Sequence, residues 1–356
     1  MAILVTGGAG YIGSHTARAL RSSGYEVVLY DNLSTGFRRL AQDFELVEGD
    51  IADDSKLRPV FARRNIDAVL HFAAYAYVGE SVDNPRKYFH NNILASLSLL
   101  NSALDVGIRR FIFSSSCAVY GIPEHIPITE QTPREPVNPY GASKLFFENA
   151  LEAYGRAYGL HSISLRYFNA AGADENGKIG ELHHPETHLI PLALTASTDD
   201  GPALRIHGSD YPTPDGTCVR DYIHVNDLAD AHVRALQYLE RDSHRNGDSL
   251  AINLGTGGGH SVLEVVQAVE SATGSPVRRK IGKRRRGNPP ILVADPAKAQ
   301  SVLGWTAKRS LADIVSSACA WMQKSSGKAA AKSTFSPVIS IQTSNRRLSI
   351  SRVEPT

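Results

Sequence analysis

The residues best suited to chemistry are a tyrosine and a lysine four positions apart. Tyr140 and Lys144 lie in a helical stretch, Tyr140–Gly159, that follows Pro139. An i, i+4 spacing places two side chains on one face of a helix, one turn apart. A free tyrosine has a pKa of about 10 and is a poor base at neutral pH. A neighbouring ammonium favours the tyrosinate. The pair therefore predicts a general base for a hydroxyl proton, although such a pair can also be two surface residues.

Three serines precede this pair at the end of an apolar run. Arg110–Ser114 reads as a buried strand, and Ser114, Ser115 and Ser116 are consecutive. Open α/β sheets bind ligands beyond the carboxyl ends of their strands. We therefore predict that Ser116 donates to the reacting oxygen or passes on its proton, although spacing alone does not choose among the three.

A glycine-rich turn lies at the start of the chain. Gly7, Gly10 and Gly13 separate a strand, Ala2–Thr6, from a helical stretch, Ser14–Ser23. Glycines allow a tight turn and a close approach of the backbone to a pyrophosphate. The free N–H groups and the positive end of the following helix then meet the phosphate charge. This pattern predicts a dinucleotide site.

Acidic residues after the next strands indicate which dinucleotide binds. Asp31 ends the strand Glu26–Tyr30 and lies 18 residues beyond Gly13, close to the spacing of roughly 20 expected for the acid that holds a ribose. A carboxylate there repels a 2′-phosphate, so the cofactor predicted is NAD rather than NADP. Asp50 ends a third strand-like run and is placed to reach the adenine, although it can also be an ordinary loop aspartate. The positive charge of oxidised nicotinamide would further favour a tyrosinate at Tyr140.

The elements around these residues alternate between short apolar strands and helices. Ala68–Phe72 and His161–Arg166 add two strands to those already named. Continuous apolar runs are typical of parallel strands covered on both faces. We predict an α/β fold: a Rossmann-type doubly wound parallel sheet with a smaller C-terminal α/β substrate lobe.

Changes in residue composition along the chain suggest where the sheet domain and the smaller lobe begin and end. Pro, Gly and His become frequent after Gly172, and the last stretch is rich in Ser, Ala, Lys and Thr with little apolar periodicity. The predicted units are an NAD-binding Rossmann domain (1–170, with a return of the chain around 221–250), a substrate-binding lobe (171–324), and a disordered tail (325–356).

Composition excludes several classes of protein. The chain has 356 residues and a formal net charge of +2, so no strong attraction to nucleic acid or membrane is expected. No apolar run reaches the ~18 residues of a membrane helix. Three scattered cysteines and the absence of a leader pattern indicate a cytoplasmic protein. His183, His184 and His188 are close together, but Pro185 interrupts them and no further ligand stands out, so we predict no metal site.

Taken together, these motifs resemble the extended short-chain dehydrogenase/reductase superfamily, and within it the UDP-glucose (UDP-galactose) 4-epimerases. The resemblance runs from residue 2 to about 323. Within this family, the chain is most similar to the bacterial branch linked to exopolysaccharide sugars. The matching blocks are Val5–His15, Val78–Ser81, Phe113–Ser116, Val119–Gly121, Tyr140–Lys144, Arg166–Asn169, Asn169–Asp174, Pro185–His188 and Val219–His224.

The resemblance implies an isomerase in which a sugar 4-hydroxyl is oxidised to a transient 4-keto sugar and reduced on the opposite face, with NAD retained. It implies Tyr140 as base, Lys144 at the nicotinamide ribose and Ser116 at the 4-hydroxyl, and a UDP-hexose as substrate of a homodimer. The cofactor residues expected besides the glycines and Lys144 are Tyr11, Ile12, Asp31, Asn32, Asp50, Ile51, Phe72, Ala73, Ala74, Asn91 and Phe168. The substrate residues expected besides Ser116 and Tyr140 are Asn169, Leu189, His207, Arg220, Arg285 and Asn288.

Several positions depart from the family pattern. A lysine near the cofactor phosphates is replaced by Ala76, within a segment, Ala73–Tyr77, that also resembles UDP-xylose/arabinose 4-epimerases. His207 stands where an aromatic residue stacks on uracil, and Asn288 stands where an acid holds the uridine ribose. Leu292 replaces a tyrosine that limits room at the sugar 2-position. UDP-pentoses and UDP-N-acetylhexosamines therefore stay open as substrates.

Two other functions are less consistent with the residues. The related nucleotide-sugar 4,6-dehydratases need an acid pair after the strand-end serine, and this chain has Cys117 and Ala118 there. A non-catalytic NAD-sensing protein on the same fold need not keep Tyr140 and Lys144, and both are present.

Overall fold

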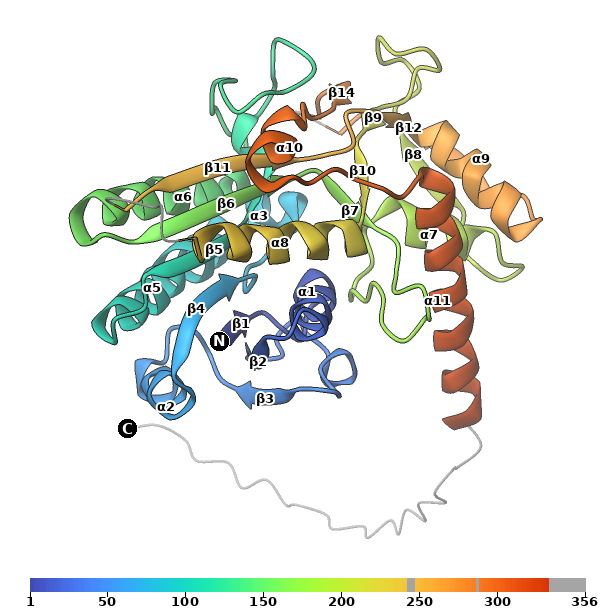
Figure 1. Cartoon of the computed structure of the whole chain (residues 1–356). Coiled ribbons are helices and arrows are strands. Elements are labelled where there is room, and N and C mark those ends of the chain that lie inside the picture. Colours follow the sequence, from blue (N-terminus) through green and yellow to red (C-terminus); the bar gives the residue numbers. More distant parts are fainter. Residues whose placement is uncertain (242–246, 286–287, 333–356) are drawn as a thin grey trace, which may run out of the picture.

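The computed structural model describes residues 1–241, 247–285 and 288–332. Its centre is a seven-stranded parallel sheet with the order β11-β6-β5-β4-β1-β2-β3 (Figure 1). The strands are β1 (Ala2–Thr6), β2 (Glu26–Asp31), β3 (Glu45–Glu48), β4 (Ile66–His71), β5 (Arg110–Ser116), β6 (His161–Tyr167) and β11 (Ser249–Leu254). The predicted α/β Rossmann-type fold is confirmed.

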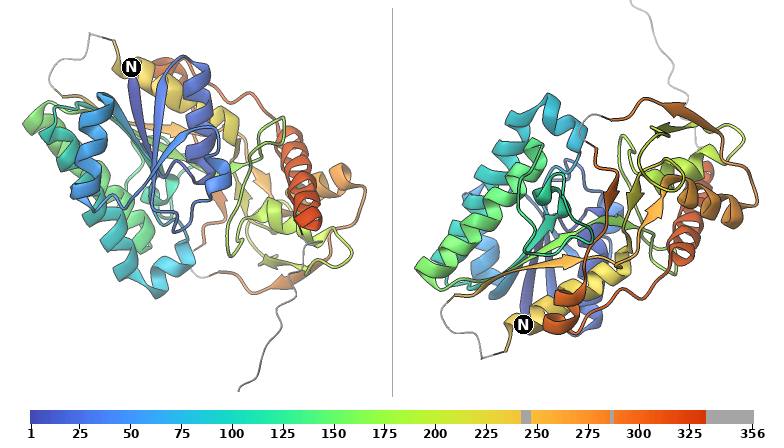
Figure 2. Two further views of the ribbon diagram at one scale, coloured as in Figure 1. Left: turned by 90° about the horizontal axis from the view of Figure 1, so that it is seen from below. Right: turned by 90° about the horizontal axis from the view of Figure 1, so that it is seen from above.

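Helices cover both faces of this sheet (Figure 2). On one face lie α1 (Tyr11–Ser22), α8 (Val225–Leu239) and α10 (Ala297–Leu303). The other face carries α2 (Asp54–Arg64), α5 (Ser96–Asp105) and α6 (Pro139–Tyr158), with α3 (Val78–Asp83), α4 (Pro85–Phe89) and the π-helical turn η2 (His90–Ala95) packed beside them. Alternate side chains of each strand fill two cores: Ile3 and Val5 face α8, whereas Leu4 faces α5. The continuous apolar strands follow from this double burial.

The strand order reverses direction between β1 and β4. In doubly wound sheets such a switch point leaves a crevice at the carboxyl ends of the strands. The turn after β1, the residues after β4 and the end of β5 meet there. Short 3₁₀ turns, η1 (Arg38–Leu40) and η3 (Cys117–Tyr120), lie after β2 and β5.

The second lobe is built from small sheets and three longer helices. Its strands are β7 (Asn169–Ala171), β8 (Leu204–His207), β9 (Val219–Arg220), β10 (Tyr222–His224), β12 (His260–Ser261), β13 (Arg279–Gly282) and β14 (Ile291–Leu292). Its helices are α7 (Leu189–Ala196), α9 (Val262–Thr273) and α11 (Leu311–Lys332). Ile190, Val266 and Val315 join these helices in a third core. In Figure 1 this lobe lies to the right of the main sheet.

The structure differs from the sequence-based expectation at the start of the first helix. This helix begins at Tyr11 rather than Ser14, with Gly10 as its N-cap; Gly13, a poor helix former, lies in its first turn and obscured this start in the sequence. The chain returns to the main sheet through α8 and β11. α11 is described to Lys332, and 333–356 lie outside the described residues. None of the described helices is both long and apolar enough to cross a bilayer.

Candidate active site

The glycine turn after β1 is packed too closely for side chains. A Cβ on Gly13 would lie 2.3 Å from the Gly7 carbonyl oxygen. A Cβ on Gly7, whose φ is +71°, would lie 2.5 Å from the Ala73 nitrogen after β4. This packing brings the start of α1 against the ends of β1 and β4, where the predicted pyrophosphate site lies.

The N-terminus of α1 suits an anion. Gly10 is its N-cap and supplies no side chain to the first-turn N–H groups. Asp31, at the end of β2, accepts hydrogen bonds from the Ala9 N–H (3.0 Å) and the Leu33 N–H (2.8 Å). Burial raises the pKa of this carboxyl. Asp31 is thus held beside the glycine turn, as expected for the ribose-binding acid.

A second hollow lies beyond Asp31. A pocket of about 420 Å³ is lined by Asn32, Glu48, Gly49, Asp50 and Lys56. The Asn32 amide donates to the Asp50 carboxylate (2.9 Å), and Ile51 is buried beneath it. The structure therefore brings Asp50, predicted to reach the adenine, together with two other expected cofactor residues, Asn32 and Ile51.

The other expected cofactor residues surround the crevice less directly. Phe72 follows β4 and its N–H donates to the Thr6 carbonyl (2.9 Å), so Phe72, Ala73 and Ala74 lie beside the glycine turn. Tyr11 donates its hydroxyl to the Gly172 carbonyl (2.6 Å) and links the two lobes. The remaining positions are Ile12 in α1, Asn91 in η2 and Phe168 between β6 and β7.

Tyr140 and Lys144 lie in the first turns of α6, as their spacing predicts. The Asn138 side chain accepts from the Gly141 N–H (2.9 Å) and caps this helix. Tyr140 is 8% exposed, and the nearby Ser116 side chain opposes the effect of burial on the pKa of its phenol. Ser114 and Ser115 are hydrogen-bonded to Tyr167 and Glu148, so Ser116 is the serine placed beside Tyr140.

Burial dominates the titration of the pair. It raises the pKa of Tyr140 to about 12, and the Ser116 side chain offsets only part of this rise. Burial also lowers the pKa of Lys144 to about 7. The Lys144 ammonium nitrogen lies 5.8 Å from the Tyr140 ring centroid and donates to the Ser114 carbonyl (2.8 Å). Burial of the phenol thus outweighs any effect of Lys144 on the pKa of Tyr140, and the expected contribution of oxidised nicotinamide stays a prediction.

A buried network beneath α6 was missed in the sequence. The Glu148 carboxylate, one turn after Lys144, accepts two hydrogen bonds from the Arg166 guanidinium, from Nε (2.9 Å) and Nη2 (2.5 Å). It also accepts one from the Ser115 hydroxyl (2.5 Å). Tyr120 accepts from Arg166 (2.8 Å). These residues come from α6, β5, β6 and η3, so no local spacing could have revealed them. The network fixes α6 to the strand that carries Ser116.

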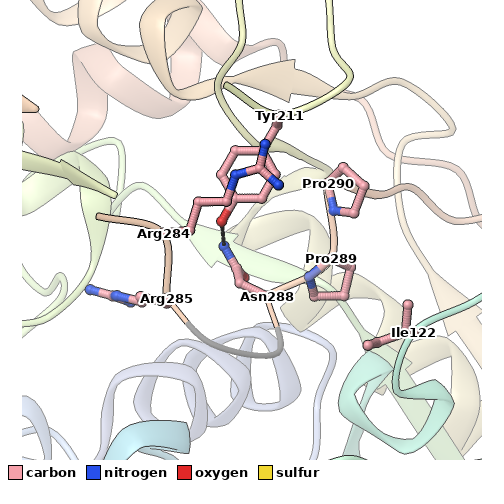
Figure 3. Close-up of a pocket in the computed structure, with 7 residues that line it drawn as sticks. All are labelled: Ile122, Tyr211, Arg284, Arg285, Asn288, Pro289 and Pro290. Atoms are coloured by element: carbon pink, nitrogen blue, oxygen red, sulfur yellow. Dashed lines mark hydrogen bonds between the residues drawn. The ribbon is translucent and has the colours of Figure 1, made fainter. Parts of the chain in front are cut away.

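The second lobe presents arginines and aromatic groups across from this pair. Figure 3 shows a pocket of about 430 Å³ whose lining residues are Ile122, Tyr211, Arg284, Arg285, Asn288, Pro289 and Pro290. The Arg284 guanidinium lies 4.3 Å from the Tyr211 ring centroid. Tyr211 was missed because its loop was interpreted only as an irregular connection. Residue 286, part of the arginine run, lies outside the described residues.

Arg220 borders this pocket and is held by neutral acceptors. It donates to the carbonyls of Val219 (2.7 Å) and Pro289 (2.8 Å) and to the Asn288 side-chain oxygen (2.7 Å). Asn288, an amide where the resembling family has an acid, therefore orients Arg220 without neutralising it. A guanidinium held in this way suits a diphosphate.

The remaining substrate candidates lie around the same side of the crevice. Asn169 starts β7 and its N–H donates to the Asp221 carbonyl (3.0 Å). Leu189 begins α7. His207 ends β8 but is not one of the residues that line the pocket of Figure 3. Burial raises the pKa of Cys117, beside Tyr140, to about 12, so this thiol is neutral and offers no acid of the kind that elimination needs.

Known proteins share both sequence and structure with this chain. The model of the NAD dependent epimerase/dehydratase family matches residues 3–255. A UDP-glucose 4-epimerase of Rhizobium meliloti is 50% identical over 319 residues, which are 90% of this chain and 96% of that protein.

Two solved structures extend the comparison. The UDP-glucose 4-epimerase from Brucella ovis in complex with NAD is 49% identical, with a TM-score of 0.86 over 89% of this chain and 97% of that one. A UDP-glucose 4-epimerase from Stenotrophomonas maltophila, solved with NAD and formylated UDP-arabinopyranose, is 42% identical, with a TM-score of 0.87 over 92% of this chain and 99% of that one.

Proposed function

The chain belongs to the NAD dependent epimerase/dehydratase family, and we propose that it is an isomerase that interconverts UDP-galactose and UDP-glucose, with NAD as its cofactor. The observation that carries the proposal is the buried Tyr140 and Lys144 in the first turns of α6, with Lys144 bonded to the Ser114 carbonyl at the end of β5, in a sheet whose switch point lies beside the glycine turn. Relatives that align over about nine-tenths of this chain are described as UDP-glucose 4-epimerases.

The residues present fit NAD. The glycine turn leaves no room for a Cβ at Gly7 or Gly13, so its backbone is free to approach the pyrophosphate closely. The first turn of α1 has N–H groups without a side-chain cap, and Asp31 offers a carboxylate to ribose hydroxyls. When bound, NAD supplies a hydride acceptor for carbon 4 of the sugar, a donor for its return, and a positive charge beside Tyr140. Gly7, Gly10 and Gly13 would hold the pyrophosphate, and Lys144 the nicotinamide ribose.

The protein's own part in the chemistry is to move one proton. Tyr140 takes the proton of the sugar 4-hydroxyl, and Ser116, placed beside it, would bind the reacting oxygen. Burial alone raises the pKa of Tyr140 to about 12, and the positive charge of bound NAD would oppose this rise, so that the same phenol oxygen takes the proton and later gives it back. A carbon–hydrogen bond at carbon 4 breaks and forms in each turnover, so there is no net redox change and NAD stays bound.

Inversion requires tight binding of UDP and loose binding of the hexose. Arg220, Arg285 and Asn288 would bind the nucleotide end, where guanidinium groups match diphosphate oxygens. Asn169, Leu189 and His207 would complete the substrate side. Weak holding of the hexose lets the 4-keto sugar turn over and accept hydride on its other face.

A second substrate class has specific support. The Ala73–Tyr77 segment resembles UDP-pentose epimerases, and a relative at 42% identity was solved with a UDP-arabinopyranose derivative. Leu292 also leaves UDP-N-acetylhexosamines as candidates. We place UDP-glucose and UDP-galactose first because the relatives at 49–50% identity carry that description.

The test is a comparison of substrates. Purified protein is incubated, without added NAD, with UDP-galactose, UDP-xylose or UDP-N-acetylgalactosamine, and the 4-epimers are separated by chromatography. The proposal predicts fastest formation of UDP-glucose from UDP-galactose. Turnover of UDP-xylose alone would contradict the substrate assignment. Tightly bound NAD with no turnover of any sugar would indicate an NAD-sensing protein.

We further propose that the protein is a homodimer and that it acts in the cytoplasm. Val82, Leu94 and Phe146 are 61, 60 and 48% exposed on elements that contact one another, α3, η2 and α6. We place the interface of a homodimer on this apolar surface, and light scattering of the wild type and of Leu94→Arg would test it. The three free cysteines are consistent with the cytoplasm. The division near residue 170 stays a prediction.

A further inference from the structure

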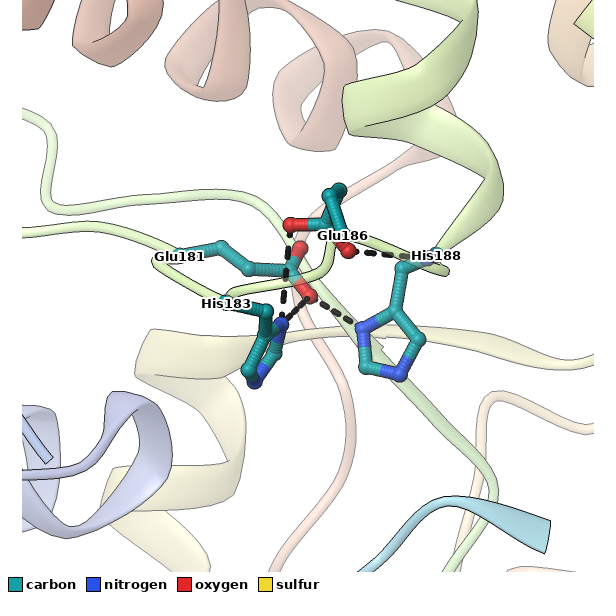
Figure 4. Close-up of side chains that lie close together, drawn as sticks. All are labelled: Glu181, His183, Glu186 and His188. Carbon is teal, nitrogen blue, oxygen red and sulfur yellow. Dashed lines mark hydrogen bonds and ion pairs between the residues drawn. The ribbon is translucent and has the colours of Figure 1, made fainter. Parts of the chain in front are cut away.

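The loop before α7 gathers two histidines and two glutamates. Figure 4 shows Glu181, His183, Glu186 and His188 facing one another. One ligand atom from each, two imidazole nitrogens and two carboxylate oxygens, lie within 4.8 Å of one another. The His183 Nδ1 lies 3.2 Å from Glu181 and 3.5 Å from Glu186, and the His188 Nδ1 contacts the same Glu181 oxygen.

We infer that these four side chains bind one divalent cation of the zinc class. Imidazole nitrogen and carboxylate oxygen are zinc ligands at about 2.0–2.2 Å, and four of them complete a tetrahedral structural site. Such ligand atoms are roughly 3.3 Å apart around the ion, so the observed group needs only a small rearrangement. Two imidazoles disfavour calcium and magnesium, which prefer oxygen ligands throughout.

The cluster has a polar side chain that its protein neighbours satisfy poorly. The Glu181 side chain is only 6% exposed, and its described polar partners are His183 and His188. The His183 Nδ1 is itself buried and makes no hydrogen bond of acceptable geometry, although two carboxylates face it. A cation placed between this nitrogen and the two carboxylates would give each of them a partner.

The charges of the cluster suit the same cation. The Glu181 and Glu186 carboxylates face two imidazoles, and one divalent cation would balance both carboxylates. Ligands must be deprotonated to bind a metal, so uptake of the cation would release protons held by the imidazoles.

The surrounding contacts hold the ligands in place. The Thr187 and His188 N–H groups donate to one Glu186 oxygen (2.7 and 2.8 Å), which leaves the other oxygen toward His183. Trp321 donates to the Glu181 carbonyl (3.0 Å), and Tyr77 to the Pro185 carbonyl (3.2 Å). The His183 ring also packs edge-on against Tyr11.

The cation would therefore tie the loop 181–188 to the glycine turn and fix the start of α7 at Leu189. Its place is structural, because four protein ligands leave no open position for substrate. The inference is independent of the proposed epimerase activity. The sequence-based expectation of no metal site rested on finding no partner ligands, and Glu181 and Glu186 supply them.

The test measures metal rather than activity. Full-length protein, purified without metal-affinity resin, is analysed for zinc by mass spectrometry, then stripped with chelator and titrated with zinc chloride or magnesium chloride by calorimetry. We expect about one zinc per chain, proton release on binding, and no comparable magnesium binding. His183→Ala and Glu186→Gln should retain under about a tenth of the zinc.

His184→Ala is the matched control, because His184 is exposed in the same loop outside the cluster. It should keep its zinc. Circular dichroism and NAD content of each variant show that the fold is intact, and Glu186→Gln removes a ligand with least disturbance if His183→Ala does not fold. No zinc binding by the wild type, equal binding of magnesium, or unchanged binding in both ligand variants would overturn the site.

Discussion

The two sides of the cleft are built differently. On the sheet side, Tyr140, Lys144 and Ser116 lie on a capped helix and a central strand, joined by the buried hydrogen bond from Ser115 to Glu148. On the lobe side, Arg220 and Asn288 lie on two-residue strands and loops and are held mostly by backbone carbonyls. Rigid elements therefore carry the proposed proton transfer, and adaptable segments carry the nucleotide.

This difference predicts which substitutions lower kcat and which raise KM. Chemistry needs reacting atoms held within a fraction of an ångström, so changes on the sheet side should lower kcat. Binding of a diphosphate needs charge at about the right place, so changes on the lobe side should raise KM. Each prediction below would sharpen this division or break it.

Tyr140→Phe should have the largest effect. Removing the general base should lower kcat by about 10²–10⁴-fold while KM for UDP-galactose stays within a few-fold. Steady-state kinetics measure both. Tyr158→Phe, an exposed tyrosine on the same helix, is the control and should match the wild type. A near-normal rate in Tyr140→Phe would remove the proposed mechanism.

Arg220→Ala should show the opposite pattern. Loss of charge-assisted hydrogen bonds worth about 1.5–3 kcal/mol should raise KM by roughly 10–100-fold, with kcat changed only a few-fold. Arg220→Lys should recover part of the loss. Arg63→Ala, an exposed arginine on α2, should leave KM unchanged. A fall in kcat alone would show that the lobe side takes part in the chemistry.

Gly13→Ala tests retention of the cofactor. The new Cβ would lie 2.3 Å from the Gly7 oxygen, and such crowding costs about 1–3 kcal/mol. We expect the NAD released on denaturation to fall about tenfold per chain, measured by chromatography. Gly79→Ala is the control, because no atom lies within 4 Å of its added Cβ. Full NAD content in Gly13→Ala would place the pyrophosphate elsewhere.

The smallest effect concerns pH and the metal-free loop. The pKa of His183 is about 6.5 when unfolded and about 9 when folded, so its stabilising charge is present below pH 6.5 and lost as pH rises to 9. Glu181, Glu186, His188, Tyr11 and Tyr77 face it. Without metal, the unfolding midpoint should fall by roughly 5 °C over this range.

Calorimetry at pH 6.5 and 9 measures this slope. His183→Ala should lose much of it, and His184→Ala should keep it. Equal slopes in the two variants would show that His183 carries no such charge.

The sequence allowed much more to be predicted on the sheet side than on the lobe side. Gly7, Gly10 and Gly13, Asp31, and the Tyr140–Lys144 pair form local patterns whose spacing reflects one turn or one helix. The strands were apparent because both of their faces are apolar.

What the sequence did not reveal depends on distant contacts. Glu148 meets Arg166 across two elements, Tyr211 lies under Arg284, and Glu181 joins His188 only when the loop folds back. The burial of Tyr140 was not apparent either, and the pKa of its phenol depends on how completely the fold covers it. Neither long-range pairing nor desolvation has a fixed spacing in sequence.

The central claim is that hydrogen leaves carbon 4 of the sugar and returns to the same carbon within one closed site. UDP-galactose deuterated at carbon 4, incubated with the protein and no added NAD, tests it by nuclear magnetic resonance. The account predicts UDP-glucose that keeps the deuterium at carbon 4. Loss of deuterium to solvent, or no UDP-glucose at all, would contradict it.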